Sequence, residues 1–166
     1  VHWTVSIESM EEEYNYIRHL GNWNDFIKNL DVINKLDHKI SFNMLHFILN
    51  YKSIHNCIDF LKGKGFGDNS FVAGPLYMPP HLNTLNLPED MLNNVVQTLK
   101  DKLDTHPQGY LKNSYENLIK YYTTTNFKKN LKSFYYNLGK MDQRRNQNGR
   151  LIFSNLFSEL DKYELE

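Results

Sequence analysis

The stretch KISFNMLHFIL, residues 39–49, decides the fold class of this 166-residue chain. It is a nearly continuous run of apolar side chains, which is typical of a parallel strand buried on both faces. Two polar residues, Asn43 and His46, interrupt the run, and Asn50 ends it. Because a buried polar group costs free energy unless it is hydrogen bonded, each interruption needs either a partner in the fold or a ligand.

Helices are predicted on both sides of this strand. Apolar residues recur at helical spacing over residues 23–33 before it and 54–61 after it. Residues 3–7 alternate between apolar and polar, as a strand does, and SFVAGPLY, residues 70–77, is a further strand that prolines end. A helix over residues 88–103 follows. The repeated order of strand and helix predicts parallel strands joined by crossover helices.

Three more helices are predicted after this α/β part, over residues 111–122, 127–141 and 151–163. We therefore divide the chain into an α/β part, 1–105, and a helical extension, 106–166. Three parallel strands with their helices form an arc of a TIM-like barrel or an open sheet. In both architectures ligands bind at the carboxyl ends of the strands.

Polar side chains gather where the predicted strands end. Ser6 and Glu8 follow the first strand, Asn50 follows the second, and residues 75–78 close the third. The carboxyl ends of neighbouring parallel strands meet at one edge of a sheet. These residues are therefore expected to converge on one ligand site.

Composition narrows the function classes. Lysine plus arginine equals aspartate plus glutamate, which argues against a nucleic-acid binder, since such proteins carry a basic excess. No apolar run approaches the roughly 20 residues of a membrane span, and the start lacks the pattern of a signal peptide. One cysteine, Cys57, leaves no internal disulfide, and we expect a cytoplasmic protein. The strand at the start predicts self-association through its edge.

Several segments carry motifs in a fixed order. SIESMEEEYNYIRHLGNW, residues 6–23, has a serine and a carboxylate at a strand end, then a tyrosine, an arginine and a helix-opening tryptophan. GPLYMPP, residues 74–80, LNLPEDM, residues 85–91, and FKKNLKSFYYNLGKMDQRRNQNGRLIFSNLFSEL, residues 127–160, follow. This ordered set resembles radical S-adenosylmethionine (SAM) enzymes, especially the subgroup with a shortened auxiliary "twitch" region.

The resemblance implies a fold and two cofactors. It matches residues 1–166 to the C-terminal half of a partial (βα)6 barrel, strands four to six, with its C-terminal helices. Such enzymes bind SAM and a 4Fe-4S cluster, which a loop with three cysteines holds. That loop is absent, and Cys57 lies on a helix stripe. The resemblance therefore implies that the cluster ligands are not in this chain and that the chain alone is inactive.

The resemblance also assigns cofactor-binding residues. Ser6 and Arg18 occupy the positions that contact the amino-acid end of SAM, and an arginine fork suits a carboxylate. Asn50 matches the residue that reaches the ribose or carboxylate, and Leu76 matches the wall of the adenine pocket. The alternatives are a surface ion pair of Arg18 with a glutamate at 11–13, a helix cap at Asn50 and an ordinary strand end at Leu76.

Three further residues are candidates to face the substrate: Glu8, Asn43 and His46. Glu8 stands where the family has aspartate, and Ser9 stands where it has glycine, which changes the local loop. Glu8 is alternatively solvated, and His46 is alternatively a hydrogen-bonded core histidine. The histidines show no metal-binding spacing, so no metal site is predicted within the chain.

Two functions follow from these patterns. The first is a piece of a radical SAM enzyme, which cleaves SAM reductively and abstracts hydrogen from a small-molecule or peptide substrate; the chain supplies part of the SAM pocket and the substrate wall. The alternative is a non-catalytic α/β binding or interaction module. Neither nucleic acid nor a membrane is an expected partner. The basic segment 140–150 is predicted to be a solvated turn between helices.

Overall fold

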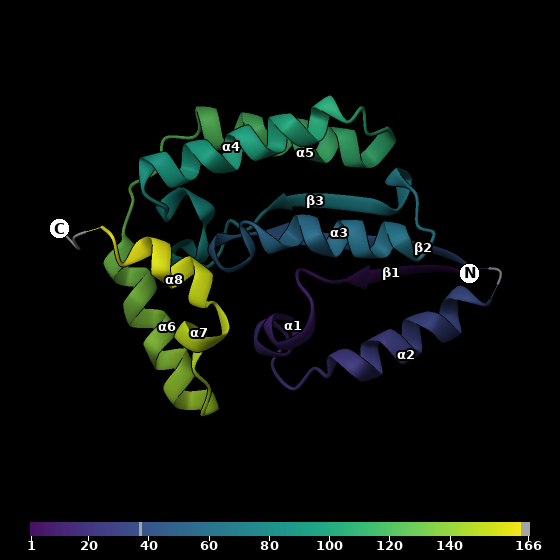
Figure 1. Ribbon diagram of the computed structural model, residues 1–166, viewed down its shortest axis with the longest axis horizontal. Coiled ribbons are helices and arrows are strands. Elements are labelled where there is room, and N and C mark those ends of the chain that lie inside the picture. Colours follow the sequence, from purple (N-terminus) through teal and green to yellow (C-terminus); the bar gives the residue numbers. More distant parts are fainter. Residues whose placement is uncertain (37, 164–166) are drawn as a thin grey trace.

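The computed structural model describes residues 1–36 and 38–163. Within them, a three-stranded parallel sheet has the order β1-β2-β3 (Figure 1). The predicted α/β class and the parallel strands are confirmed. β2 ends earlier than predicted, because the chain turns into a short 3-10 helix, η1, at Ile48–Asn50. The strands are β1 (His2–Ser6), β2 (Lys39–His46) and β3 (Phe71–Pro75).

Helices connect the strands in the predicted order, with one addition. The helix α1 (Glu11–Ile17) lies in a segment that the sequence patterns predict only as a connection. Three glutamates in its first turn favour it, because they lie at the positive end of the helix dipole. The other connecting helices are α2 (Trp23–Asn34), α3 (Ser53–Gly63) and α4 (Glu89–Asp104), with 3-10 turns η2 (Asp68–Ser70), η3 (Pro80–Leu82) and η4 (Thr84–Asn86).

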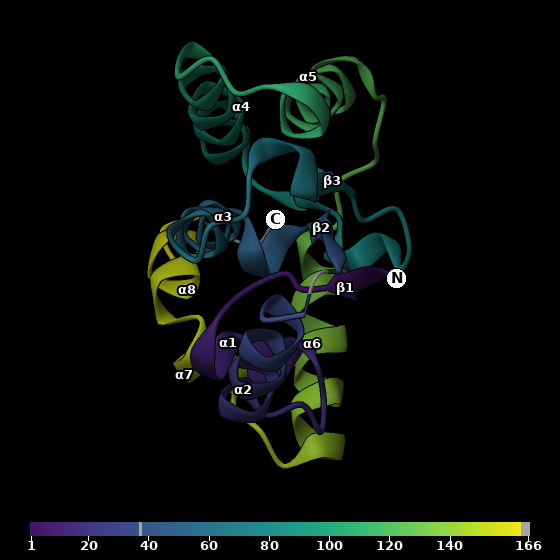
Figure 2. The ribbon, with the colours of Figure 1, turned by 90° about the vertical axis from the view of Figure 1, so that its right-hand side faces the viewer.

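The prediction that β2 is buried on both faces is wrong, because buried and exposed side chains alternate along it and one face of the sheet is open. Along β2, Phe42, Met44 and His46 are buried, and α3 lies on this side of the sheet (Figure 2). Side chains alternate along a strand, so the residues between them point to the opposite face. We call that side the open face, because its residues Asn43, Leu45 and Val72 are exposed.

The two edges of the sheet also differ. The outer edge of β3 is covered by α5 (Gly109–Thr124), where Ser114 Oγ accepts a hydrogen bond from the Ala73 backbone N–H at 2.9 Å. On either side of β1, the Val1 carbonyl accepts from Lys39 N–H and the Ile7 N–H donates to the Asn43 carbonyl, so both residues bond toward β2. Because the backbone groups of a parallel strand alternate in direction, those of His2, Thr4 and Ser6 point away from the sheet, and none of them is described as bonded to another strand.

The C-terminal helices deviate from the sequence prediction in their bounds. The helix α6 spans Leu131–Arg145 and ends at Asn146, which has a left-handed conformation with φ 50°. The predicted helix over 151–163 is two helices, α7 (Gly149–Ile152) and α8 (Ser154–Leu160). Most of the basic segment predicted as a turn is therefore helical. The last three residues of the predicted extension, 164–166, lie outside the described residues.

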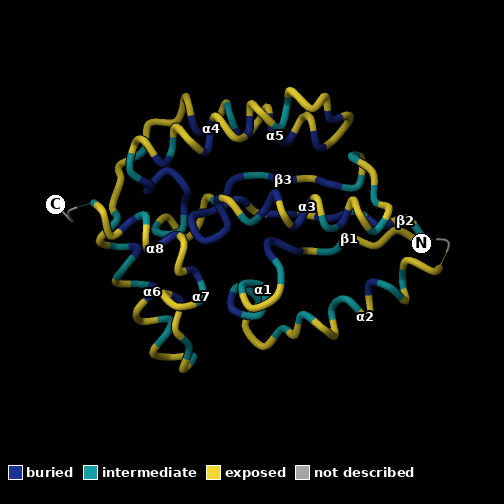
Figure 3. Tube along the Cα trace, viewed as in Figure 1, coloured by how far each residue is buried: buried dark blue, intermediate teal, exposed yellow. Residues whose placement is uncertain are grey.

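The core lies between the sheet and the helices, and the outer sides of α4 and α5 are exposed (Figure 3). One continuous cluster contains side chains from both predicted parts of the chain, for example Phe42 of β2 and Phe134 of α6. Across the described ranges, each helix is too short or too polar to cross a bilayer.

Candidate functional site

A cavity of about 250 Å³ lies at the carboxyl ends of the three strands, and we call it the rim pocket. Its walls come from three places: the ends of the strands, the last turn of α1 and the last turn of α6. The location agrees with the general rule for parallel sheets. The pocket is lined by Glu8, Tyr16, Ile17, Arg18, Leu45, Phe47, Leu49, Leu76, Leu82, Met141 and Arg145.

The charged centre of the rim pocket is an ion pair between Arg18 and Glu8. Arg18 Nε donates to Glu8 Oε2 at 2.8 Å, and Arg18 Nη2 donates to Glu8 Oε1 at 2.5 Å. The Glu8 side chain is 4% exposed and the Arg18 side chain is 38% exposed. Burial raises the pKa of Glu8, and the nearby guanidinium of Arg18 opposes that rise. The partner of Arg18 is therefore Glu8 and not a glutamate at 11–13.

Asn50 is fully buried behind the rim pocket, and the described hydrogen bonds of its side chain all go to backbone atoms. Its Nδ2 donates to the carbonyl oxygens of Glu8 at 2.9 Å and Leu45 at 2.8 Å, and its Oδ1 accepts from Phe47 N–H at 2.8 Å. It does not cap the next helix, α3, whose N-cap residue is Lys52, but its bond with Phe47 N–H closes the capping box of η1. Asn50 thus ties the loop after β1 to the end of β2 and fixes the position of Glu8.

The C-terminal helices reach the rim pocket through α1. The hydroxyl of Tyr16 donates to Asp142 Oδ1 at 2.7 Å, and Gly149 N–H donates to Asp142 Oδ2 at 2.9 Å. Burial and this hydrogen bond raise the pKa of Tyr16. Arg145 Nη1 donates to the Tyr16 carbonyl at 3.1 Å. These contacts hold the last turn of α6 against the pocket, so Met141 and Arg145 line it.

The other predicted residues lie elsewhere. The side chain of Ser6 is exposed near the end of β1, and it is outside the lining of the rim pocket. Asn43 lies on the open face in a groove of about 580 Å³ between the sheet and α5. The structure therefore brings together Glu8, Arg18 and Leu76, with Asn50 behind them, and leaves Ser6 and Asn43 outside.

His46 occupies the opposite side of the sheet from Asn43 and is fully buried. It shares a hydrogen bond of 2.5 Å with the Tyr122 hydroxyl and one of 3.2 Å with the Tyr51 carbonyl. Burial, with a smaller contribution from His55, lowers the pKa of His46 to about 3. These contacts make His46 a hydrogen-bonded residue of the core, and it does not line the rim pocket.

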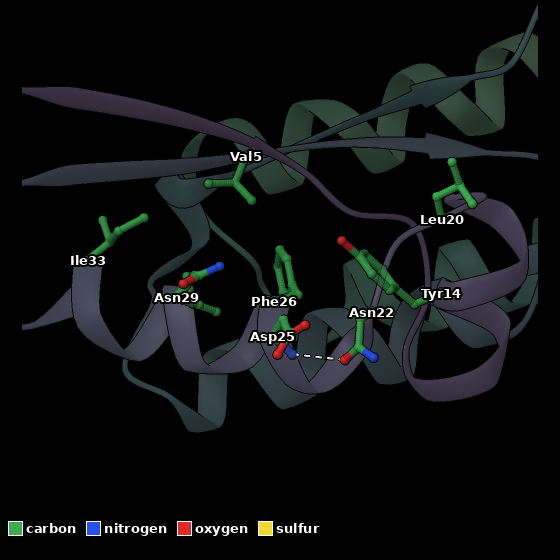
Figure 4. Close-up of a pocket in the computed structure, with 9 residues that line it drawn as sticks. Val5, Tyr14, Leu20, Asn22, Asp25, Phe26, Asn29 and Ile33 are labelled. Carbon is green, nitrogen blue, oxygen red and sulfur yellow. Dashed lines mark hydrogen bonds between the residues drawn. The ribbon is translucent and has the colours of Figure 1, made fainter.

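A further hollow, of about 420 Å³, separates β1 from α2 (Figure 4). Val5 of β1 faces Phe26 and Ile33 of α2 across it. Asn22, which caps α2 by accepting from Asp25 N–H at 3.0 Å, lies at its lower end. The hollow adjoins the outer edge of β1, which has no neighbouring strand among residues 1–36 and 38–163.

Three residues that form or support the rim pocket carry no prediction from the sequence: Tyr16, Asp142 and Arg145. Asp142 and Arg145 lie in the segment 127–160, which contributes to the family resemblance, but the resemblance assigns them no chemical role. Their spacing of three residues on one helix was the available signal, because such residues share a face. Tyr16 lies in α1, a helix that was not predicted.

The residues of this chain suit SAM but not the 4Fe-4S cluster. The N–H donors of the Arg18 fork suit the carboxylate of SAM, and the apolar side chains of Leu45 and Leu76 beside it suit the adenine ring. The chain does not fit the cluster. Its single cysteine, Cys57, is buried, donates to the Ser9 carbonyl and has its pKa raised by burial to about 12.

In the described part of the chain, no group of three or more His, Cys, Asp or Glu side chains is arranged to hold a metal ion. Comparisons of the chain with protein-family models, curated proteins and solved structures give no match.

Proposed function

We propose that this chain forms the C-terminal half of the partial barrel of a radical SAM enzyme and that its rim pocket holds SAM. The observation that carries the proposal is the convergence of Arg18, Glu8 and Leu76 in one cavity at the carboxyl ends of three parallel strands. The family resemblance assigns Arg18 and Leu76 to SAM, and both line this cavity.

The ion pair prepares Arg18 for a ligand carboxylate. A guanidinium has five N–H donors, and two of them bond to Glu8, so three remain. Glu8 fixes the orientation of the fork, and the exposed part of Arg18 stays accessible. A bound carboxylate would gain charge-assisted hydrogen bonds without first ordering the side chain.

The remaining residues take different roles in this proposal. Leu45 and Leu76 offer an apolar surface to the adenine. Asn50 acts indirectly, because all its described hydrogen bonds hold the loop that carries Glu8. Asn43, on the open face, lies where the substrate of a barrel enzyme would bind. Ser6 contributes only if SAM extends beyond the rim pocket along the open face.

The edge of β1 supports the barrel architecture. Its outward backbone groups lack a strand partner among the described residues, and the hollow in Figure 4 leaves room beside it. A preceding parallel strand would pair there and continue a TIM-like (βα)6 arc. In the proposed enzyme, the other half of the barrel supplies the cysteines of the 4Fe-4S cluster, so this chain alone is inactive.

The same edge favours the second candidate, a non-catalytic interaction module. An unpaired strand edge can add a strand from another chain. In this alternative the open edge, and not the rim pocket, is the functional feature, and the chain associates through β1 with itself or with a partner.

NMR titration of the isotope-labelled chain tests the proposal. S-adenosylhomocysteine is the probe, and 5′-methylthioadenosine, which lacks the amino-acid carboxylate, is its matched control. Half the pocket is expected to bind weakly, with a dissociation constant on the order of 1 mM, about 4 kcal/mol. We expect shifts at Arg18, Leu45 and Leu76 with the first compound and smaller ones near Arg18 with the second.

Variants complete the test. Arg18→Lys should weaken binding of S-adenosylhomocysteine, because lysine lacks the planar fork, whereas Arg150→Lys at an exposed pair should not. If Arg18→Lys destabilises the chain, the double variant Arg18→Ala with Glu8→Gln removes the fork without leaving a buried charge. An absence of shifts at the pocket, together with self-association that Thr4→Pro abolishes, would favour the interaction module.

A further inference from the structure

The rim pocket carries a second guanidinium whose charge the described residues do not balance. Arg18 is neutralised by Glu8, but Arg145, on the wall formed by α6, has no described carboxylate within 4.0 Å. Its one described hydrogen bond goes to the Tyr16 carbonyl. Since a guanidinium has five donors, most of those on Arg145 are available to a bound group.

The position of Arg145 is fixed by contacts that connect it to Arg18. Asp142 lies one turn earlier on α6 and accepts from the Tyr16 hydroxyl and from Gly149 N–H. Tyr16 is fully buried in α1, and Arg18 directly follows α1 as its C-cap. The two arginines are therefore held on one packed unit, on different walls of the same cavity.

Gly149 shows how closely this unit is packed. A Cβ at this position would lie 2.7 Å from the Tyr16 hydroxyl oxygen and 3.3 Å from Asp142 Oδ1. Only glycine therefore allows α7 to begin so close to α1. This close approach lets the Gly149 amide hold Asp142, and Asp142 in turn orients the last turn of α6.

We propose that Arg145 is an anion-binding residue and that the second ligand of the rim pocket, the substrate, carries a carboxylate or phosphate group. Asp142 is its positioning residue. This inference rests on the proposed function, because it takes the rim pocket as the ligand site and assigns its first guanidinium, Arg18, to SAM.

Arginine-selective NMR on the whole chain tests the inference. The probes are N-acetylglycine, inorganic phosphate and, as the neutral control, N-acetylglycinamide. We expect a saturable shift of the Arg145 Nε–H signal with either anion and none with the amide. The signals of Arg144 and Arg150, exposed on the same helical region, are internal references and should move only as general salt effects require.

Three variants sharpen the result. Arg145→Gln should weaken anion binding about tenfold or more, the loss expected for a charge-assisted hydrogen bond. Arg145→Lys should restore part of it, because it restores the charge. Asp142→Asn should weaken anion binding while S-adenosylhomocysteine still shifts Arg18, which a general loss of folding would not allow.

The outcomes separate this inference from the proposed function. If anions move Arg145 no more than Arg144 and Arg150, the inference is wrong even where S-adenosylhomocysteine binds at Arg18. If S-adenosylhomocysteine shifts Arg145 and leaves Arg18 unchanged, the carboxylate of SAM occupies this site, and the assignment of Arg145 to a substrate is wrong. If anions bind at Arg145 and S-adenosylhomocysteine binds nowhere, the proposed function fails and the anion site stands.

Discussion

Replacing Arg18 by alanine should expose the cost of the buried carboxylate at Glu8. The Glu8 side chain is 4% exposed and takes both of its described charge-assisted hydrogen bonds from Arg18. Removing one partner of a buried ion pair typically costs 3–5 kcal/mol. Because Arg18 is itself 38% exposed and water can enter the space it leaves, we expect a loss near the lower end, about 3 kcal/mol.

The loss should depend on pH with a defined sign. Burial already raises the pKa of Glu8 from 4.5, and Arg18 opposes that rise. Without Arg18 the folded pKa rises further, so the folded state binds more protons than the unfolded state above pH 4.5. The variant should therefore lose stability as pH rises from 4.5 toward its folded pKa, by at most about 1.4 kcal/mol per pH unit.

Denaturant unfolding followed by far-UV circular dichroism between pH 5 and pH 8 measures both effects. The double variant Arg18→Ala with Glu8→Gln should recover most of the lost stability at pH 8, because it removes the buried charge. Arg150→Ala, at an exposed pair with Asp161, should cost less than about 1 kcal/mol. A single variant as stable as the protein itself, or a double variant with no recovery, would refute the buried-charge reasoning.

Three further predictions concern stability. Burial lowers the pKa of His55 to about 4, and neither of its ring nitrogens has a described partner; stability should fall as pH drops from 6.5 toward 4, because the histidine gains a proton there only when unfolded, and His55→Leu should reduce this slope, with His46, whose pKa is also lowered, supplying the remainder. Asn50→Ala should cost about 2–4 kcal/mol in denaturant unfolding, since it leaves buried backbone groups unpaired, whereas the exposed Asn117→Ala should cost under about 0.5 kcal/mol. Gly149→Ala should lower the melting temperature, because its Cβ would clash with Tyr16, and this loss should shrink in the Tyr16→Phe background; equal losses in both backgrounds would contradict the clash.

Much of the fold was predictable because its signals are local. The nearly continuous apolar run of β2 and the alternation in β1 identify strands. The helix α1 was missed, because its short apolar pattern is masked by three glutamates. The bounds of α6 shifted, since Asn146 ends it in a left-handed conformation, which the pattern of apolar residues does not report.

The candidate site was only partly predictable. The order of the motifs selected Glu8, Arg18, Asn50 and Leu76, and the structure brings these four to one place. It could not show that Asn50 serves the backbone, that His46 faces the core, or that Glu8 is the partner of Arg18. The burial of His46 depends on which face of β2 packs against the helices. The roles of Asn50 and Glu8 depend on the path of the loop after β1.

Hydrophobic periodicity and the alternation of strand and helix were enough to establish a parallel α/β chain with polar residues at its strand ends, because both arise from neighbours along the chain. The second wall of the rim pocket was decided only by tertiary packing. It requires Tyr16 to meet Asp142, 126 residues later, and no local pattern encodes a contact across that separation. Arg145 lies beside the paired charges of Glu8 and Arg18 only because α6 packs against α1.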